Sequence, residues 1–289
     1  MVEGFGGIAD KRIVLDVDVV PRRCRFCGKT ESEATFRDEA QVIPFGLGNR
    51  TLLSRGECDS CNHRFGETIE IALQDFVGPL RTLSGIRGRN GVPTYRRRPD
   101  SPPIRFRAPK LILMNEEGKD DSVVLHHGSD GKSLSVEVEC PPLDLQVVAR
   151  ALARIALFFL RTDADGPFFR LVQWARGEVS CCETSIFELL LPGSGVSNIG
   201  LFSLTRPPAD RRDQPIVASL TVGCVAYFLP LPRSDWRIGT LDLGGLLLAL
   251  GFPAAFGPKL SLTEFKVPGT GGRISLRRVI RMVQKPETP

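Results

Sequence analysis

The chain has 289 residues, of which 42% are hydrophobic and 25% are charged, with a formal net charge of +5. This length and composition indicate a globular protein with ample material for a buried core, and they exclude a disordered chain. No apolar run approaches the roughly 20 residues that a membrane-spanning helix needs. Acidic residues at positions 10, 16 and 18 interrupt the apolar stretches near the N-terminus. We therefore expect a cytoplasmic protein with no secretory leader and no membrane partner.

In the first third of the chain, alternating β-branched residues predict a strand over Ile13–Val20. Apolar residues recur at helical spacing over Ile69–Leu83, with a Gly-Pro pair at 78–79 that predicts a kink or an end. Residues 84–103 are rich in Gly, Pro and Arg, which is typical of a loop or linker. We place a domain boundary in this stretch, between residues 1–95 and residues 96–289.

The remainder of the chain alternates between strand and helix patterns. The clearest amphipathic helix spans Leu145–Leu160, and a shorter helix over Phe168–Arg176 should end at Gly177. The apolar segment Leu241–Leu250 fits neither period. Strands are expected over residues 104–114, 122–127, 133–139, 196–204 and 216–229.

Four of the eight cysteines form two tight pairs, Cys24-x-x-Cys27 and Cys58-x-x-Cys61. Two such pairs offer four thiolates, which is the tetrahedral ligand set of a structural Zn²⁺ ion. The 30 residues between the pairs exceed the spacing of a simple zinc ribbon, so a folded segment must lie between them. A reducing compartment with bound metal explains this cysteine usage better than a disulfide framework, which suits much smaller secreted domains.

Three segments around these pairs resemble the zinc-containing branch of the HNH endonuclease family. They are Cys24-Arg-Phe-Cys-Gly-Lys29, Glu39-Ala-Gln-Val-Ile-Pro-Phe-Gly-Leu-Gly-Asn49 and Glu57-Cys-Asp-Ser-Cys-Asn-His-Arg-Phe-Gly66. The resemblance covers about residues 21–90 and implies that the two cysteine pairs hold the base of a β-hairpin against the start of a helix. The expected fold class is α+β, with an N-terminal zinc-clamped ββα (HNH-like) unit followed by a larger mixed α/β region.

The resemblance also implies a metal-dependent DNA endonuclease site in this unit. Catalysis would need a general base, and Mg²⁺ or another divalent cation on the scissile phosphate. The family's general-base histidine corresponds to Gln41, whose amide does not titrate near neutral pH. Strand alternation places Glu39 on the same face, where its carboxylate or that of the adjacent Asp38 could act instead. Asn62 matches the residue that faces the catalytic metal.

Several roles at this site stay open. Asn62 could be a helix cap rather than a metal-facing residue, and His63 could be an ordinary exposed helix residue. The family's middle asparagine has no clear counterpart, since Asn49 is the nearest and could simply follow a glycine turn. Gln41 either leaves the site inactive, or is an engineered replacement, or is compensated by a carboxylate.

Basic residues concentrate in two stretches. Residues 81–110 contain nine basic residues and one acid, a local charge of +8, and residues 273–285 contain five basic residues and no acid. Such stretches can neutralise phosphates, although a solvated loop is the alternative. The expected nucleic-acid contacts are Arg87, Arg89, Arg96, Arg97 and Arg98.

Three functions therefore compete. The first is an HNH-type DNA endonuclease that hydrolyses phosphodiesters with a divalent metal. The second is a catalytically inactive, zinc-stabilised module that binds nucleic acid or a partner protein. The third is a zinc-stapled structural brace with no nucleic-acid role.

Overall fold

The computed structural model describes residues 2–5, 12–17, 20–96, 99, 101, 103–107, 110–113, 123–127, 133–160, 168–180, 183–190, 197–205, 215–223, 225–232, 261–269 and 271–283. The predicted segment at 241–250 and the arginines at 97 and 98 lie outside them.

The N-terminal unit is a small sheet followed by three short helices. Strand β4 (Leu52–Ser54) pairs in parallel with β2 (Ile13–Leu15) and antiparallel with β3 (Ala40–Gln41). A 3₁₀ turn, η1 (Phe45–Leu47), lies in the loop between β3 and β4. Helix α1 (Asp59–Glu67) begins directly after Cys58 and contains Cys61, so the second cysteine pair lies at its start. The hairpin of β3 and β4 followed by α1 confirms the expected ββα arrangement.

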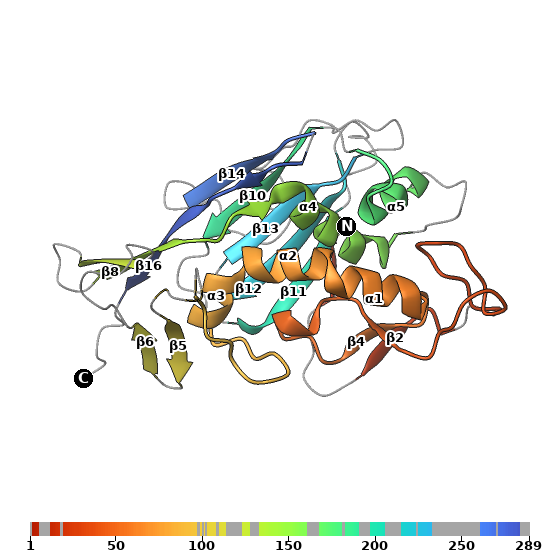
Figure 1. The fold of residues 1–289 in the computed structure, drawn as a ribbon, viewed down its shortest axis with the longest axis horizontal. Helices are drawn as coiled ribbons and strands as arrows, with labels where there is room; N and C mark the ends of the chain where they lie inside the picture. The colour runs from red at the N-terminus through yellow and green to blue at the C-terminus, as the bar shows by residue number, and fades with distance from the viewer. Residues whose placement is uncertain are drawn as a thin grey trace.

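Two further helices follow, α2 (Ile69–Phe76) and α3 (Gly78–Leu83). The chain changes direction at Val77, between them, where Pro79 near the start of α3 cannot donate to the preceding turn. The expected interruption at the Gly-Pro pair is therefore present. Figure 1 shows α3, α2 and α1 in a row from left to right across the view, with β2 and β4 below α1.

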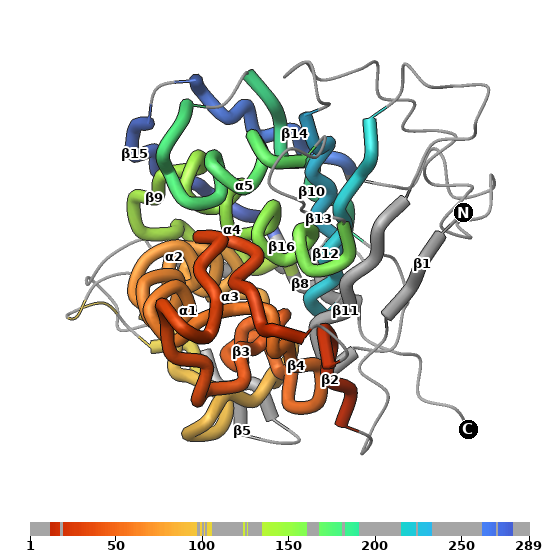
Figure 2. The backbone as a smooth tube through the Cα atoms, turned by 90° about the vertical axis from the view of Figure 1, so that its right-hand side faces the viewer, coloured from red at the N-terminus to blue at the C-terminus, as the bar shows by residue number. Residues whose placement is uncertain are grey.

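The largest sheet has six strands, all antiparallel, in the order β1-β11-β12-β13-β10-β14. Its members are β1 (Val2–Phe5), β10 (Thr184–Leu190), β11 (Ser197–Thr205), β12 (Val217–Gly223), β13 (Val225–Pro230) and β14 (Ser261–Val267). The helices of the described residues lie on one side of this sheet (Figure 2).

Smaller ladders extend the C-terminal region. Strands β5 (Ile104–Arg107) and β6 (Lys110–Leu113) form an antiparallel pair, and β8 (Ser133–Glu139) lies between β7 (Val123–His127) and β16 (Arg277–Val283). Two short strands, β9 (Leu143–Asp144) and β15 (Arg273–Ile274), also pair.

Helix α4 (Leu145–Leu157) begins at Asp144, whose carboxylate accepts a hydrogen bond of 2.9 Å from the Gln146 amide. Helix α5 (Phe169–Arg176) ends at Gly177, which has a φ of 75° that a residue without a Cβ adopts readily. Both helices were expected, although α4 ends three residues earlier than its pattern suggested.

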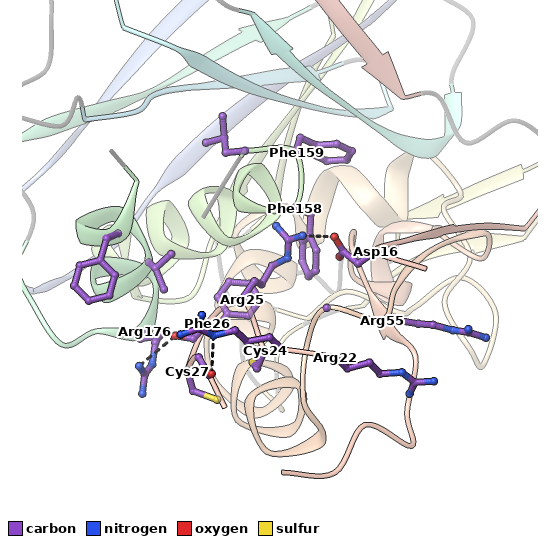
Figure 3. Close-up of a pocket in the computed structure, with 16 residues that line it drawn as sticks. Asp16, Arg22, Cys24, Arg25, Phe26, Cys27, Arg55, Phe158, Phe159 and Arg176 are labelled. Atoms are coloured by element: carbon purple, nitrogen blue, oxygen red, sulfur yellow. Dashed lines mark hydrogen bonds and ion pairs between the residues drawn. The ribbon is translucent and has the colours of Figure 1, made fainter. Parts of the chain in front are cut away.

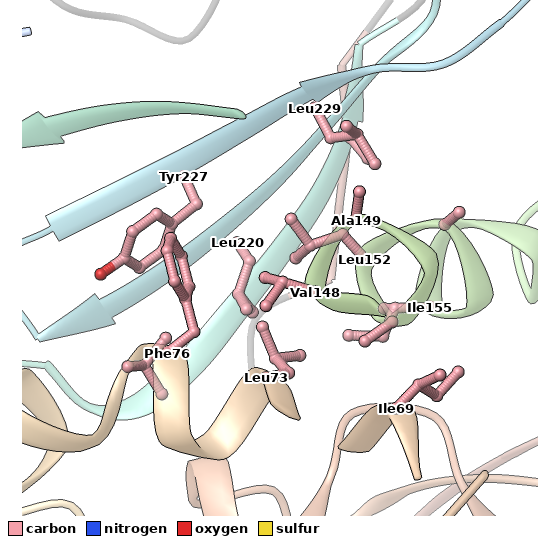
Figure 4. Close-up of a cluster of buried hydrophobic side chains, with 14 of the residues drawn as sticks. Ile69, Leu73, Phe76, Val148, Ala149, Leu152, Ile155, Leu220, Tyr227 and Leu229 are labelled. Atoms are coloured by element: carbon pink, nitrogen blue, oxygen red, sulfur yellow. The ribbon is translucent and has the colours of Figure 1, made fainter. Parts of the chain in front are cut away.

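Helix α4 joins the N-terminal unit to the large sheet. Apolar side chains of α2, α4, β12 and β13 converge in one cluster, in which the ring of Phe76 lies 5.0 Å from that of Tyr227 between centroids (Figure 4). This hydrophobic cluster is continuous from Phe26 beside the first cysteine pair to Leu229 in the sheet. The site in the N-terminal unit is therefore supported from behind by the C-terminal region.

Two predicted strands are hairpins instead. The stretch 104–114 divides into β5 and β6, and the stretch 216–229 divides into β12 and β13. In the second case Val222 pairs with Val225, and Gly223 has a φ of 61°, which allows a tight reversal of the chain. Because so few residues form this turn, the apolar pattern of the sequence continues through it. Of the predicted strand over Ile13–Val20, the described residues place Ile13–Leu15 in β2 and leave Asp16, Val17 and Val20 outside any strand. No helix among the described residues is long and apolar enough to cross a bilayer.

Candidate metal centre and active site

The four paired cysteines come together in one cluster. The Sγ atoms of Cys24, Cys27, Cys58 and Cys61 all lie within 4.8 Å of one another, and all four are free thiols. The Sγ atoms of Cys27 and Cys58 are 3.7 Å apart. A tetrahedron with Zn–S bonds of ~2.3 Å has sulfur atoms about 3.8 Å apart. The donor set and its spacing therefore fit a Zn²⁺ ion held by four thiolates.

The local backbone structure directs the side chains of each cysteine pair toward the centre of the cluster. The Gly28 amide donates to the Cys24 carbonyl at 2.8 Å, which closes the first pair into a tight turn, and Gly28 has a φ of 73°. In the second pair, Cys58 is the N-cap of α1, so its thiol stands at the helix start. The Cys58 amide points at the Cys24 sulfur at 3.5 Å. The hairpin base and the helix tip are thereby joined, as expected.

Crowding of the thiols separates their acidities. A hydrogen bond from Cys61 is the largest cause that lowers the pKa of Cys24, and the same bond raises the pKa of Cys61. Burial raises the pKa of Cys58. Negative charge on Cys24 also contributes to the raised pKa values of Cys58 and Cys61, because neighbouring negative charges repel. A bound divalent cation would offset this repulsion and favour the thiolate form of its ligands.

Gln41 is the second residue of β3 and pairs in register with Leu53 of β4. Its backbone carbonyl accepts a hydrogen bond of 3.3 Å from the Arg154 side chain. The buried Oε1 atom of its side chain accepts no hydrogen bond from the described residues. The amide therefore offers an unused acceptor, but an amide cannot take a proton from water near neutral pH.

The carboxylate of Glu39 is already engaged. It forms ion pairs with Arg12 and with Arg55, the latter at 3.6 Å, and its side chain is 24% exposed. Neighbouring guanidinium groups compete with water for the oxygens of a carboxylate. Glu39 is therefore poorly placed to accept a proton from a water molecule. Asp38, next to it, is exposed, and its amide donates to Asp59 at 3.0 Å.

Asn62 is the fourth residue of α1 and is half-buried. The N-cap position belongs to Cys58 instead, so the helix-cap alternative for Asn62 is wrong. The next residue, His63, is exposed on the outer face and forms an (i, i+4) pair with Glu67 at 3.1 Å. This arrangement agrees with an ordinary surface role for the histidine.

Asn49 has a defined structural function in the loop between β3 and β4. Its buried amide group donates to the carbonyls of Ile43 at 2.8 Å and Leu52 at 2.9 Å. Its Oδ1 accepts from the amides of Thr51 at 3.3 Å and Leu52 at 3.0 Å. One side chain therefore satisfies the backbone of the loop that follows Gln41. Asn49 does more than follow a glycine turn.

A buried ionic cluster behind the site was missed by sequence reasoning. Arg154 of α4 pairs with Glu57 at 2.7 Å and with Glu70 at 2.8 Å, and its side chain is 1% exposed. Its guanidinium also lies 5.3 Å from the ring centroid of Phe65 and 5.2 Å from that of Phe158. Glu57 lies in the motif directly before Cys58 and could have been predicted to have a role at the site. Nothing in the sequence pattern of α4 indicated that Arg154 is its ion-pair partner.

The predicted basic loop lies against the N-terminal unit. Arg50 donates to the Gly88 carbonyl at 3.2 Å, and the guanidinium groups of Arg50 and Arg89 lie 4.5 and 5.5 Å from the ring centroid of Phe45. Arg50, Arg87 and Arg89 are exposed, and none of them has an ion-pair partner in the described part of the chain. We name these three residues the loop arginines. Arg50 was not among the predicted contacts.

Other basic residues are placed differently. Arg96 is exposed and donates to the Ser101 carbonyl at 2.5 Å. In the second basic stretch, Arg278 is 4% exposed and donates to the Tyr227 hydroxyl at 2.8 Å, and Arg277 pairs with Glu137 at 2.9 Å. The expectation that this second stretch neutralises phosphates is therefore wrong for Arg278, whose charge is directed into the core.

Comparison with known proteins agrees with this geometry. Residues 24–76 match the model of a family described as HNH endonuclease. The matched segment contains both cysteine pairs and the hairpin, α1 and α2. The chain therefore carries an N-terminal HNH endonuclease domain with a cysteine cluster suited to zinc. No curated protein and no solved structure matches the chain.

A second, catalytic cation has weaker support. Among the described residues, the four cysteines form the one group of three or more Cys, His, Asp or Glu side chains close enough to hold a metal. Mg²⁺ prefers carboxylate and carbonyl oxygens in octahedral geometry. The residues expected to serve this ion are the amides of Gln41 and Asn62 and the arginine-paired Glu39. These residues fit a tightly held catalytic ion poorly.

Proposed function

We propose that the protein is an HNH-derived DNA-binding protein stabilised by one structural Zn²⁺ ion. Gln41 stands in place of the general-base histidine, and the protein therefore hydrolyses phosphodiesters inefficiently or not at all. The observation that carries the proposal is the surroundings of Gln41 on β3. By resemblance Gln41 corresponds to the family's base, and the carboxylate of Glu39, which directly precedes β3, is paired with two arginines. A general base contributes roughly 10²–10⁴-fold in rate, so its loss leaves a very slow site.

The loop arginines support DNA as the partner. They are exposed and lack acidic partners among the described residues, and two of them flank Phe45. Arginine at such positions contacts phosphate oxygens in a bidentate manner. The loop between β3 and β4 would thus face the DNA backbone beside the Gln41 strand. The expected contacts Arg97 and Arg98 belong to the same proposal, although they lie outside the described residues.

A plasmid assay with Mg²⁺ or Mn²⁺ tests the catalytic part of the proposal. The wild-type protein should leave the plasmid intact, whereas Gln41→His should nick it, with a rate at least a hundredfold higher. Gln41→Asn is the matched control, because it changes the packing at this position without supplying a base. Rapid cleavage by the wild type that Glu39→Gln abolishes would instead favour an active endonuclease with a carboxylate base.

Salt-dependent binding of duplex DNA tests the partner. Affinity should fall steeply as salt rises, and the triple change Arg50→Ala, Arg87→Ala and Arg89→Ala should reduce the slope of log K against log[salt] by up to ~2.7. Arg37→Ala removes one exposed charge elsewhere on the domain, which is paired with Asp59, and should change the slope by less than one third as much. An affinity that does not depend on salt would favour the structural brace.

A further inference from the structure

A groove with a volume of about 740 Å³ opens at the junction between the N-terminal unit and the end of α4. The turn of the first cysteine pair forms one wall, the residues after β4 form a second, and α5 forms a third. None of Glu39, Gln41 and Asn62 lines it. The groove is therefore separate from the proposed HNH site, and its size lies within the range of pockets that enclose small organic ligands.

The groove is strongly basic. Five arginines line it against one acid, Asp16. Arg25 at its floor is neutralised by Asp16 at 2.6 Å and lies 5.1 Å from the ring centroid of Phe158. In Figure 3, Arg22 and Arg55 extend toward one side of the groove, and Arg176 lies at the opposite side.

Two of these arginines keep their charge available. Arg22 and Arg23 each donate one hydrogen bond to a backbone carbonyl, to Phe36 at 3.0 Å and to Gly28 at 2.9 Å. Neither has an ion-pair partner among the residues that the structure describes. A carbonyl contact leaves most donors of a guanidinium group free and holds the group in place. The rim at the first cysteine pair therefore carries two guanidinium groups that form no ion pair with a described residue, and the nearest acidic influence on Arg23 is that of Glu33.

Aromatic surface accompanies this charge. Phe169, the first residue of α5, lines the groove and is 44% exposed. Phe158 lines its floor and is buried. An exposed aromatic side chain that lines the same groove as several arginines is a combination that proteins use for unpaired bases, because bases stack on the ring while arginines follow the phosphates. A duplex, whose bases are stacked on each other, cannot use Phe169 in this way.

We propose that this groove binds a single strand of nucleic acid, with Arg22 and Arg23 on its phosphates and a base on Phe169. The inference rests on the proposed DNA-binding function and extends it, since it gives the C-terminal region a direct part in holding the strand. The HNH domain supplies the charged rim and α5 supplies the aromatic surface, so the two parts of the chain form the site jointly.

The test is fluorescence anisotropy with the full chain, without added Mg²⁺, using a labelled oligothymidylate as the single-stranded probe and a labelled hairpin as the duplex probe. Arg22→Ala combined with Arg23→Ala should lower the salt slope for oligothymidylate by ~1.4, at ~0.7 for each lost phosphate contact. Phe169→Ala should weaken oligothymidylate binding roughly fivefold or more and leave hairpin binding unchanged.

Two control variants remove an exposed group of the same kind elsewhere. Arg37→Ala controls for charge on the same domain, and Leu262→Ala, which is 43% exposed on β14, controls for apolar surface. Equal affinities of the groove variants and the wild type for oligothymidylate would overturn the proposal. So would full binding of thymidine monophosphate with no gain from a longer strand, which would indicate a nucleotide pocket instead.

The two proposals fail in distinguishable ways. Loss of hairpin binding in the loop-arginine variant, together with unchanged oligothymidylate binding in the groove variants, would remove the groove proposal alone. Absence of salt-dependent hairpin binding by the wild type would contradict the proposed function. The groove proposal is tested separately, by comparing the oligothymidylate affinities of the wild type and Phe169→Ala.

Discussion

Arg154 and Glu57 are 97 residues apart in the chain, yet the Nη2 atom of the arginine lies 2.7 Å from Oε2 of the glutamate. The two side chains are 1% and 0% exposed. Glu57 directly precedes Cys58, the N-cap of α1, and Arg154 also donates to the Gln41 carbonyl. A single guanidinium of the C-terminal region therefore holds both the second cysteine pair and the strand of the candidate active site.

Replacing Arg154 with Met should destabilise the protein by about 3–5 kcal/mol, because Glu57 and Glu70 would be left buried without their cation. The measurement is chemical denaturation at pH 8, where carboxylates favour the ionised form. Arg37→Met removes a comparable ion pair at the surface, with Asp59 at 3.6 Å and the arginine 84% exposed. That control should cost under about 1 kcal/mol.

A further variant separates lost pairing from lost packing. Adding Glu57→Gln and Glu70→Gln to Arg154→Met removes the orphaned charges and should restore part of the lost stability. A triple variant as unstable as Arg154→Met alone would show that the arginine acts through its contacts with the phenylalanine rings, and not through its charge.

The stability of the protein should depend on pH through Glu57. Burial raises the pKa of Glu57 to about 7, although Arg154 acts in the opposite direction; the unfolded value is about 4.3. The folded state therefore binds the proton more tightly than the unfolded state between these values. The resulting stability is complete below about pH 4.3 and is lost as pH rises through about 7.

The corresponding measurement compares the wild type with Glu57→Gln by denaturation between pH 5 and pH 8. The wild type should lose stability relative to the variant as pH rises, since the amide does not ionise. Parallel stability curves for the two proteins would contradict the assigned cause.

Purified protein should contain one zinc ion per chain, measured by elemental analysis. Cys58→Ser should abolish binding, because it removes one of four ligands, and a strong chelator should unfold residues 21–66. Cys140→Ser is the control: this cysteine is also free and buried but lies outside the cluster, so zinc content should be retained. Wild-type protein without zinc would remove the basis for the metal centre.

Asn49→Asp should lower the free energy of unfolding by about 1–3 kcal/mol. The variant retains acceptors for the amides of Thr51 and Leu52 but turns the donor toward the carbonyls of Ile43 and Leu52 into an acceptor. Asn90→Asp, at an exposed position of the neighbouring loop, serves as the comparison. Equal stabilities of the two variants would argue that the loop does not depend on Asn49.

The local parts of this fold were open to prediction because their signals are local. The cysteine spacing predicted the thiol cluster, and the apolar periodicity predicted α2 and the start of α4. The interruption by Pro79 also follows directly from its covalent structure. These features depend on residues within a few positions of each other, where propensity and spacing act without help from the rest of the chain.

The features that were missed depend on distant partners. Arg154 lies on an amphipathic helix, where a charged residue normally predicts a solvent-exposed face. Its burial could be predicted only if its ion pairs with Glu57 and Glu70 were already known. Arg278 similarly belongs to a stretch that resembles a basic surface, but β16 places it beside Glu188 and the Tyr227 hydroxyl. The placement of Gln41 on β3 followed from the sequence, whereas the two arginines on Glu39 did not.

The apolar surface shared by α2 and α4 has a practical consequence for dissecting this protein. A fragment ending at residue 95 would present Leu73 and Phe76, both fully buried in the intact chain, to water. Each such exposure costs about 1.5–3 kcal/mol. Fragments of this kind should aggregate or require a detergent, so biochemical work on the zinc-binding unit is best done by point substitution in the whole polypeptide.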